Sequence, residues 1–195
     1  MIHAVLIFNT SGVPRLTKFY TPLHQSPQTV IPKIFSLISI RPAGLCNFLD
    51  APELDAFLGP KDDLDDRWRV VYRNYATLYF VFVVDGAESE LGVLDLIQVF
   101  VEALDRAFEN VCELDLVFHF DEVHHILAEI IQGGLVLETN VEEISNSAKT
   151  ASKARKDSFV SANPLALGAG VGARNGPLPT PLGWLTDKLT GVSGR

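Results

Sequence analysis

Residues 72–138, YRNYATLYFVFVVDGAESELGVLDLIQVFVEALDRAFENVCELDLVFHFDEVHHILAEIIQGGLVLE, decide the fold. Within them, residues 77–85 form an almost continuous run of β-branched and aromatic side chains, which is typical of a strand buried on both faces. Ser89 then follows as a candidate N-cap, and Glu90 suits the first turn of a helix, where the helix dipole is positive. The stretch therefore predicts a central strand followed by a long helix over residues 90–110.

The predicted helix 90–110 is apolar over more than half of its circumference. A main stripe recurs at three- and four-residue spacing, and a second stripe lies beside it. A helix that lies on one small sheet needs only one stripe, so either another part of this chain or a partner chain covers the second. Burial by the next helix is at least as consistent with the pattern as a partner. The partner-interface candidates on the second stripe are Leu96, Val99 and Ala103.

Shorter patterns around this centre predict the remaining elements. Their order is β-β-α-β-β-α-α, which indicates an α/β sandwich with antiparallel hairpins on a shared sheet. The predicted flanking elements are strands 2–9 and 16–20, a helix that begins at Ser26-Pro27 or near Pro32 and ends at Arg41-Pro42, strand 67–75, and a helix from about Asp115 that Gly133-Gly134 ends.

Two segments differ in composition from the rest of the chain. Residues 51–66 carry six acidic side chains and one lysine, and we interpret them as an acidic loop insertion. Residues 145–195 hold seven of the fourteen glycines and four prolines, which is typical of disorder. We therefore predict one domain over residues 1–144 and a mostly disordered tail over residues 145–195.

Composition narrows the classes of function. With 195 residues and 47% hydrophobic residues, the chain can build a proper core, and its net charge of −8 argues against a cationic nucleic-acid surface. The two cysteines, Cys46 and Cys112, stand beside apolar residues and are expected to be free, buried thiols in a reducing compartment. No signal peptide and no apolar run near the ~18 residues of a membrane span is present. We expect a cytoplasmic protein.

Motifs that carry chemistry are absent from the sequence. It has no GxxxxGK[ST] phosphate loop, and no GxGxxG follows a predicted strand. Asp121 and His125 share a helix face and could bind a metal, but a solvated ion pair is the better interpretation. We expect no catalytic residues, no metal and no cofactor.

Several blocks of the sequence resemble a known family. They are MIHAVLIFNTSGVPRLTKFY, RNYATLYFVFVVD, ESELGVLDLIQVFVEALDRAFENVCELDLVFH and ILAEIIQGGLVLETN. Together they resemble the small (sigma) subunits of the heterotetrameric clathrin-adaptor complexes, most of all those of adaptor protein complex 3. The resemblance runs from Met1 to about Ile144 and is interrupted by the acidic loop.

The resemblance implies a longin-like fold, in which helices sandwich a five-stranded antiparallel sheet. The residue pattern gives only four strands, so a fifth, short strand is expected between Asn47 and Arg67. The resemblance also implies a non-catalytic subunit of a vesicle coat, with a delta-type large chain as direct partner and beta-type and mu-type chains in the same complex. The implied role is the sorting of membrane cargo at the Golgi apparatus and endosomes towards lysosomes or vacuoles, with peripheral membrane association through the complex.

In related adaptors the sigma chain helps to bind acidic dileucine signals, [DE]xxxL[LI], in cargo tails. Two leucines need adjoining apolar pockets, and the acidic residue needs a cation some residues away. The resemblance assigns that cation to Arg15, aided by the large chain. Thr77 stands where related chains have glycine, which is expected to narrow the pocket. The pocket residues that the resemblance implies are Ala76, Leu78, Val101, Asn110, Val111 and Leu116.

Two alternatives stay open at this point. Leu78 and Val101 are as consistent with plain core positions as with a binding site. The chain could also be a longin-domain tether or scaffold that regulates a small GTPase, since such a protein would share the fold and lack catalytic residues. Exposure of Leu96, Val99 and Ala103 in the isolated chain would indicate a partner surface.

Overall fold

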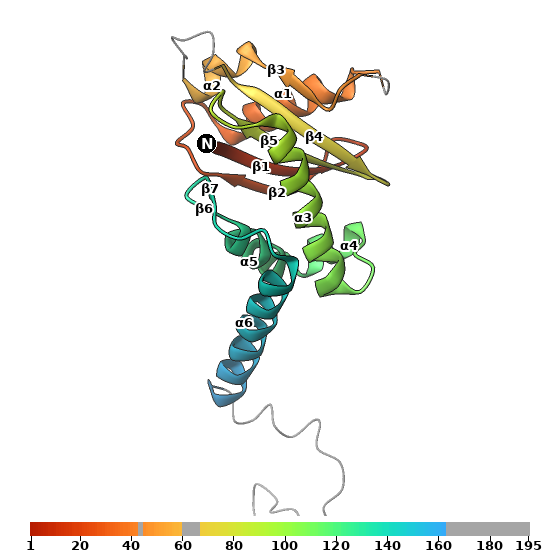
Figure 1. The fold of residues 1–195 in the computed structure, drawn as a ribbon, viewed down its shortest axis with the longest axis vertical. Helices are drawn as coiled ribbons and strands as arrows, with labels where there is room; N and C mark the ends of the chain where they lie inside the picture. Colours follow the sequence, from red (N-terminus) through yellow and green to blue (C-terminus); the bar gives the residue numbers. More distant parts are fainter. Residues whose placement is uncertain (43–44, 60–66, 163–195) are drawn as a thin grey trace, which may run out of the picture. The chain divides into compact units, whose positions relative to one another are not determined.

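The protein contains a five-stranded antiparallel sheet in the order β2-β1-β5-β4-β3, with helices packed on it (Figure 1). The computed structural model describes residues 1–42, 45–59 and 67–162. Residues 1–155 form one structural unit. The five strands are β1 (Ile2–Asn9), β2 (Pro14–Phe19), β3 (Phe48–Asp50), β4 (Arg69–Tyr75) and β5 (Leu78–Val84).

The predicted central strand is confirmed. Every residue of β5 except Tyr79 is buried, because β1 and β4 flank it and helices cover both of its faces. Phe80 and Phe82 point into one hydrophobic layer, whereas Val81 and Val83 point into the other. This two-sided burial explains why no polar residue interrupts the run.

Helices cover both faces of the sheet, as in a longin-like fold (Figure 1). On one face lie α3 (Glu90–Phe108), α4 (Glu113–Phe118) and α5 (Phe120–Ile130), together with the start of α6 (Val141–Ala162). The opposite face is covered by α1 (Pro27–Ser39), the short 3-10 helix η1 (Pro52–Leu54) and α2 (Asp55–Leu58).

Both apolar stripes of α3 pack within the chain. Leu96 is 4% exposed, Ala103 is fully buried, and Val99 is partly buried against the same core. Helix α5 packs against α3 and supplies part of this cover. Burial within the chain is therefore correct for Leu96 and Ala103, and the wide apolar arc does not by itself indicate a partner chain.

The single helix predicted from about Asp115 to Gly133-Gly134 is wrong in detail. The backbone leaves helical geometry at His119, with φ −111° and ψ 38°, and this separates α4 from α5. A hairpin of β6 (Ile131–Gln132) and β7 (Leu135–Val136) follows α5, and the two glycines form its turn at φ 60° and 83°. Gly134 has no room for a side chain, since a Cβ there would lie 2.3 Å from the carbonyl oxygen of Ile2.

The fifth strand expected from the resemblance is present as β3, at the edge of the sheet beside β4. The interpretation of the acidic insertion as a plain loop is wrong for its first part. Ala51, Leu54 and Leu58 are buried in the layer under α1, which requires the helical geometry of η1 and α2. Residues 60–66, with most of the acidic side chains, lie outside the described residues.

Helix α6 continues through the segment where the composition predicted disorder. It extends from Val141 to Ala162, and Ile144 and Ala148 are buried in the core. The predicted disorder is therefore wrong for residues 145–162, while residues 163–195 lie outside the described part of the chain. The domain boundary at residue 144 stays a prediction.

The two cysteines are free, as predicted, but they are not buried. Both Cys46 and Cys112 are exposed. The thiol of Cys46 donates a hydrogen bond to the carbonyl oxygen of Phe48, and Cys112 is the N-cap residue of α4. A position beside apolar residues in the sequence was not sufficient to place these side chains in the core.

Ser89 caps α3 as predicted. Its hydroxyl accepts a hydrogen bond from the backbone N–H of Gly92 at 3.4 Å. We expect Ser89→Ala to lower the free energy of unfolding by about 1 kcal/mol, because an N–H in the first turn loses its acceptor. Urea denaturation of the full chain measures this, and Ser89→Asp is the matched control because aspartate keeps the cap. Equal losses in both variants would contradict a capping role.

Asp85 anchors the start of the chain. Its carboxylate accepts from the Met1 ammonium at 2.5 Å and lies 3.0 Å from Nε2 of His3. Burial raises the pKa of Asp85, but hydrogen bonds and charge attraction from the ammonium and His3 outweigh this and hold the pKa below its ordinary value. A lowered pKa in the folded state stabilises the fold above the unfolded value, about 4, and this contribution is lost as the pH falls through the folded pKa.

We therefore expect Asp85→Asn to reduce the loss of stability on acidification from about pH 5 to pH 3. The variant is also less stable than the wild type at neutral pH, because the ammonium loses one of its two carboxylate partners. Thermal unfolding measured across this pH range checks both effects. Glu88→Gln is the control, since Glu88 is a second carboxylate that contacts the same ammonium, at 3.0 Å. If Asp85→Asn loses as much stability on acidification as the wild type, the stabilising role of the ionised Asp85 carboxylate is contradicted.

Candidate functional site

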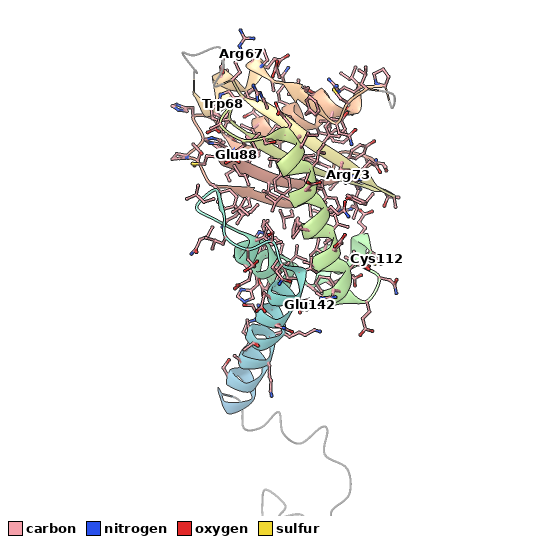
Figure 2. All side chains as sticks on the ribbon, in the orientation of Figure 1. Arg67, Trp68, Arg73, Glu88, Cys112 and Glu142 are labelled. Carbon is pink, nitrogen blue, oxygen red and sulfur yellow. The ribbon has the colours of Figure 1, made fainter. Side chains whose placement is uncertain are left out.

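A pocket of about 910 Å³ lies beside the β4–β5 turn. The second half of α3, the α3–α4 connection, α4 and the first residues of α6 form its other walls. Cys112 and Glu142, labelled in Figure 2, reach it from the α4 and α6 sides. The pocket is lined by Tyr75, Ala76, Thr77, Leu78, Phe80, Val101, Glu102, Asp105, Arg106, Val111, Cys112, Glu113, Leu116, Val141 and Glu142.

A tight turn brings the first wall into place. Tyr75 pairs with Leu78, so only Ala76 and Thr77 connect β4 to β5. Ala76 adopts a left-handed conformation with φ 53°, which the closed turn requires. The turn thereby presents two consecutive small or medium side chains at the pocket, followed by the apolar Leu78.

The α3–α4 connection forms the second wall through two consecutive left-handed residues, Glu109 at φ 52° and Asn110 at φ 83°. Such a backbone is uncommon for residues other than glycine, although asparagine tolerates it. The carboxylate of Asp105 accepts a hydrogen bond from the N–H of Val111 at 3.1 Å and fixes the connection. Val111 consequently faces the pocket.

Helix α4 begins with a reciprocal cap. The N–H of Cys112 donates to the carboxylate of Asp115 at 2.8 Å, which closes a capping box. Hydrogen bonds from the Cys112 backbone and side chain lower the pKa of the Asp115 carboxyl, because they stabilise its ionised form. This arrangement directs Leu116, one turn into α4, at the base of the pocket.

The base of the pocket is apolar and rigid. Leu78 is 7% exposed and Leu116 is 1% exposed. The Phe80 ring makes edge-to-face contacts with Tyr75, at 5.7 Å between centroids, and with Phe100, at 5.9 Å. Burial raises the pKa of the Tyr75 phenol, with Arg73 partly opposing it, so the phenol stays neutral. Such a surface favours the burial of apolar ligand side chains.

Charged groups surround the rim of the pocket. Four carboxylates line it, and Arg106 is the cation among the lining residues. Arg106 lies 3.7 Å from the carboxylate of Glu142. The rim therefore has a negative balance, which is unfavourable for an acidic ligand. The four carboxylates belong to Glu102, Asp105, Glu113 and Glu142.

Arg15, from β2, is held next to this rim. Its Nη2 lies 2.6 Å and its Nε 2.7 Å from Oε1 of Glu113. Arg15 is not itself among the lining residues, but its partner Glu113 is. The predicted cation is therefore adjacent to the pocket and occupied by a carboxylate of the same chain.

The structure brings together five of the seven predicted signal-binding residues, namely Ala76, Leu78, Val101, Val111 and Leu116. Asn110 does not line the pocket, and its left-handed backbone positions Val111 instead. Arg15 does not line the pocket but forms an ion pair with Glu113, which does. The prediction missed the aromatic base and the charged rim, which the alternation of β5 and the polar arc of α3 could have indicated.

A second pocket of about 360 Å³ lies between the start of α3 and the β6–β7 hairpin. Leu96 and Val99 line it together with Val136, whereas Ala103 does not. Two of the three partner-interface candidates therefore border a hollow at the surface. Their contact with a partner chain stays a prediction.

The described residues hold no group of three side chains suited to bind a metal ion. His125 lies 4.0 Å from Glu129, one turn further along α5, so its ion-pair partner is not Asp121. Across the described ranges, no helix has the length and apolar character needed to cross a membrane.

Comparison with known proteins gives one consistent family. The family model for the clathrin adaptor complex small chain matches residues 1–155. The sigma subunit of the AP-3 complex of Schizosaccharomyces pombe is 59% identical over 150 residues, which cover 76% of this chain and 85% of that protein. The human AP-3 complex subunit sigma-2 is 53% identical over 145 residues, covering 74% and 71% respectively.

Structural comparison also finds a chain of the AP-3 complex. A chain of a full-length AP-3 complex, described as a homology model in a stretched open conformation, superposes with a TM-score of 0.61 at 45% identity. The match covers 83% of this chain and 99% of that chain.

Proposed function

Because this chain belongs to the clathrin adaptor complex small chain family and within it resembles the AP-3 sigma subunits, we propose that its large pocket binds acidic dileucine signals. As a member of this family it is a non-catalytic subunit of an adaptor complex in vesicle-mediated protein transport. The proposal adds a ligand, [DE]xxxL[LI], and a binding surface to that membership.

One observation carries the proposal. Five residues that were assigned to the signal pocket come from three separate segments, and they line the same apolar pocket. They lie on the β4–β5 turn and the start of β5, on α3, and on the α3–α4 connection with α4. A set of unrelated core positions would not be expected to converge on one open hollow.

The physical chemistry of the pocket suits two adjacent leucines. Each leucine side chain contributes about 1.5–3 kcal/mol on full burial, and a rigid base avoids the cost of ordering the site. Two leucine side chains fit within about 910 Å³. The negative rim means that the acidic residue of the signal needs Arg15 and, in the assembled complex, cations from the large chain.

The chain assembles, in this proposal, directly with a delta-type large chain and shares its complex with beta-type and mu-type chains. The complex attaches peripherally to Golgi, endosome and vesicle membranes and sorts cargo towards lysosomes or vacuoles. Similarity to AP-3 sigma subunits supports this assignment. The hollow beside Leu96 and Val99 is a candidate contact for the large chain. The alternative of a scaffold for a small GTPase has no comparable support.

The test uses the assembled four-chain complex and a fluorescent peptide with the sequence pattern [DE]xxxLL. We expect saturable binding, and loss of binding when both leucines of the peptide are replaced by alanine. Failure of this chain to assemble with the delta-type chain would overturn the adaptor assignment. Assembly without any binding of the peptide would overturn the proposed ligand alone.

Cys112 provides a direct readout of pocket occupancy. It lines the pocket and is exposed, whereas Cys46 is exposed but belongs to the segment before β3. We expect a saturating dileucine peptide to slow alkylation of Cys112 by a maleimide at least about threefold, because the bound peptide blocks access. Alkylation of Cys46, measured by mass spectrometry of the same sample, stays unchanged. Equal protection of both thiols, or of neither, would contradict binding in this pocket.

A further inference from the structure

We infer that Glu113 competes, from within the chain, with the acidic residue of the signal for Arg15. This inference rests on the proposed function, because it concerns how the same pocket recognises the acidic residue of its ligand. Arg15 is the cation that the signal needs, and Glu113 already occupies it. The signal can then use Arg15 only by displacing a carboxylate of the protein.

The contacts of Glu113 place it in that competing position. Its Oε1 atom accepts from both Nη2 and Nε of Arg15, at 2.6 and 2.7 Å, and from the side-chain amide of Asn9 at 3.2 Å. Glu113 also lines the pocket, whereas Arg15 and Asn9 do not. The carboxylate that holds Arg15 therefore belongs to the pocket lining, while Arg15 itself does not.

The pair has the exposure of an exchangeable contact. The side chains of Arg15 and Glu113 are 26% and 29% exposed. An ion pair at this exposure contributes little to stability, because water and salt screen it. A fully buried pair would resist separation, since one unpaired charge would remain in the interior. Here a ligand carboxylate can replace the protein carboxylate with little net cost.

As a consequence, the acidic residue of the signal contributes less to the binding affinity. The bond from a signal carboxylate to Arg15 is offset by the bond that Glu113 gives up. The leucines then dominate affinity, and the acidic residue adds less than it would at a free arginine. Glu113 is in this sense a specificity-determining residue that lowers the discrimination between acidic and neutral signals.

The experiment measures the affinity of two peptides for the assembled complex by isothermal titration calorimetry. One peptide carries glutamate at the acidic position of the signal, and the other carries glutamine. In Glu113→Gln we expect the glutamate peptide to bind roughly two- to fivefold more tightly than to the wild type, with the glutamine peptide unchanged. Raising the salt concentration reduces the gain, because the contact is screened.

Glu102→Gln is the matched control. Glu102 lines the same pocket and carries the same charge, but its partner is the side-chain amide of Gln98 at 2.8 Å and not Arg15. This variant also lowers the negative charge of the rim, so we expect at most a small gain for the glutamate peptide, well below the gain in Glu113→Gln. In an Arg15→Gln background, Glu113→Gln should give no gain beyond that of Glu102→Gln.

Five outcomes would overturn the inference. Equal tightening for both peptides, or the same gain in Glu102→Gln, would mean that only the total charge of the rim matters. Weaker binding of both peptides would mean that the pair only stabilises the contact between β2 and α4. An undiminished gain in Glu113→Gln when Arg15 is absent would exclude competition for that cation. Absence of dileucine binding by the wild-type complex would overturn the proposed function as well, which distinguishes the two failures.

Discussion

Replacing Val101 by aspartate is expected to lower the affinity of the assembled complex for an acidic dileucine peptide at least about 100-fold. Val101 lines the pocket and is half-buried against the core. A carboxylate there faces apolar leucine side chains without a partner, and burying it costs several kcal/mol. The negative rim increases this penalty, because the new charge adds to four existing carboxylates. Fluorescence anisotropy with the labelled peptide measures the loss.

Val99→Asp separates this effect from a general weakening of the helix. Val99 is also a half-buried valine on α3, but it lines the smaller pocket and not the larger one. We expect Val99→Asp to reduce the amount of complex that forms with the large chain. The complex that does form should bind the peptide with the wild-type affinity. A second variant, Val101→Ala, keeps the site apolar and should lower the affinity less than about tenfold. Loss of peptide binding in Val99→Asp but not in Val101→Asp would reject the site.

The residue pattern was sufficient for the central sheet but not for its edge. The apolar run of β5 and the alternation of Trp68, Val70 and Tyr72 on one face each correspond to real burial. Strand β3 has three residues and only partial burial, so no periodic signal marks it. Its presence was expected from the family resemblance alone.

Two errors have clear physical reasons. Periodicity continues on both sides of His119, and neither proline nor glycine stands there, so the break between α4 and α5 leaves no trace in the sequence. Helix α6 was missed because small polar residues dominate its composition. Ile144 and Ala148, four residues apart, are the part of its buried stripe that could have indicated it.

The pocket itself could not be derived from spacing. Leu78 and Val101 are as consistent with core as with a site in the sequence, and in the structure they pack on the core and also line the pocket. Their role in signal binding stays a prediction. The Arg15–Glu113 pair joins residues 98 positions apart. No local pattern contains such a contact, because it arises only when the sheet and α4 are brought together.

Replacing Phe100 by alanine is expected to lower the free energy of unfolding of the full chain by about 3–5 kcal/mol. Phe100 is fully buried on α3 and packs its ring edge-to-face with Phe80 at 5.9 Å. Truncation removes this contact and leaves a cavity that the surrounding sheet and helices can fill only in part. Urea denaturation monitored by circular dichroism measures the loss. A domain of ordinary stability has a free energy of unfolding of about 5–15 kcal/mol, so the variant keeps only part of that stability.

The same truncation tests whether the base of the pocket depends on the core. Phe80 contacts Phe100 behind the pocket and lines the pocket in front, so a cavity at position 100 removes the support of the base. We expect weaker dileucine binding by Phe100→Ala even at temperatures where the complex stays assembled. Phe118→Ala is the matched control, because Phe118 is 76% exposed and its truncation should change stability by no more than about 0.5 kcal/mol. A comparable loss of stability in both variants would mean that burial on the α3 face of the sheet does not determine the stability of this fold.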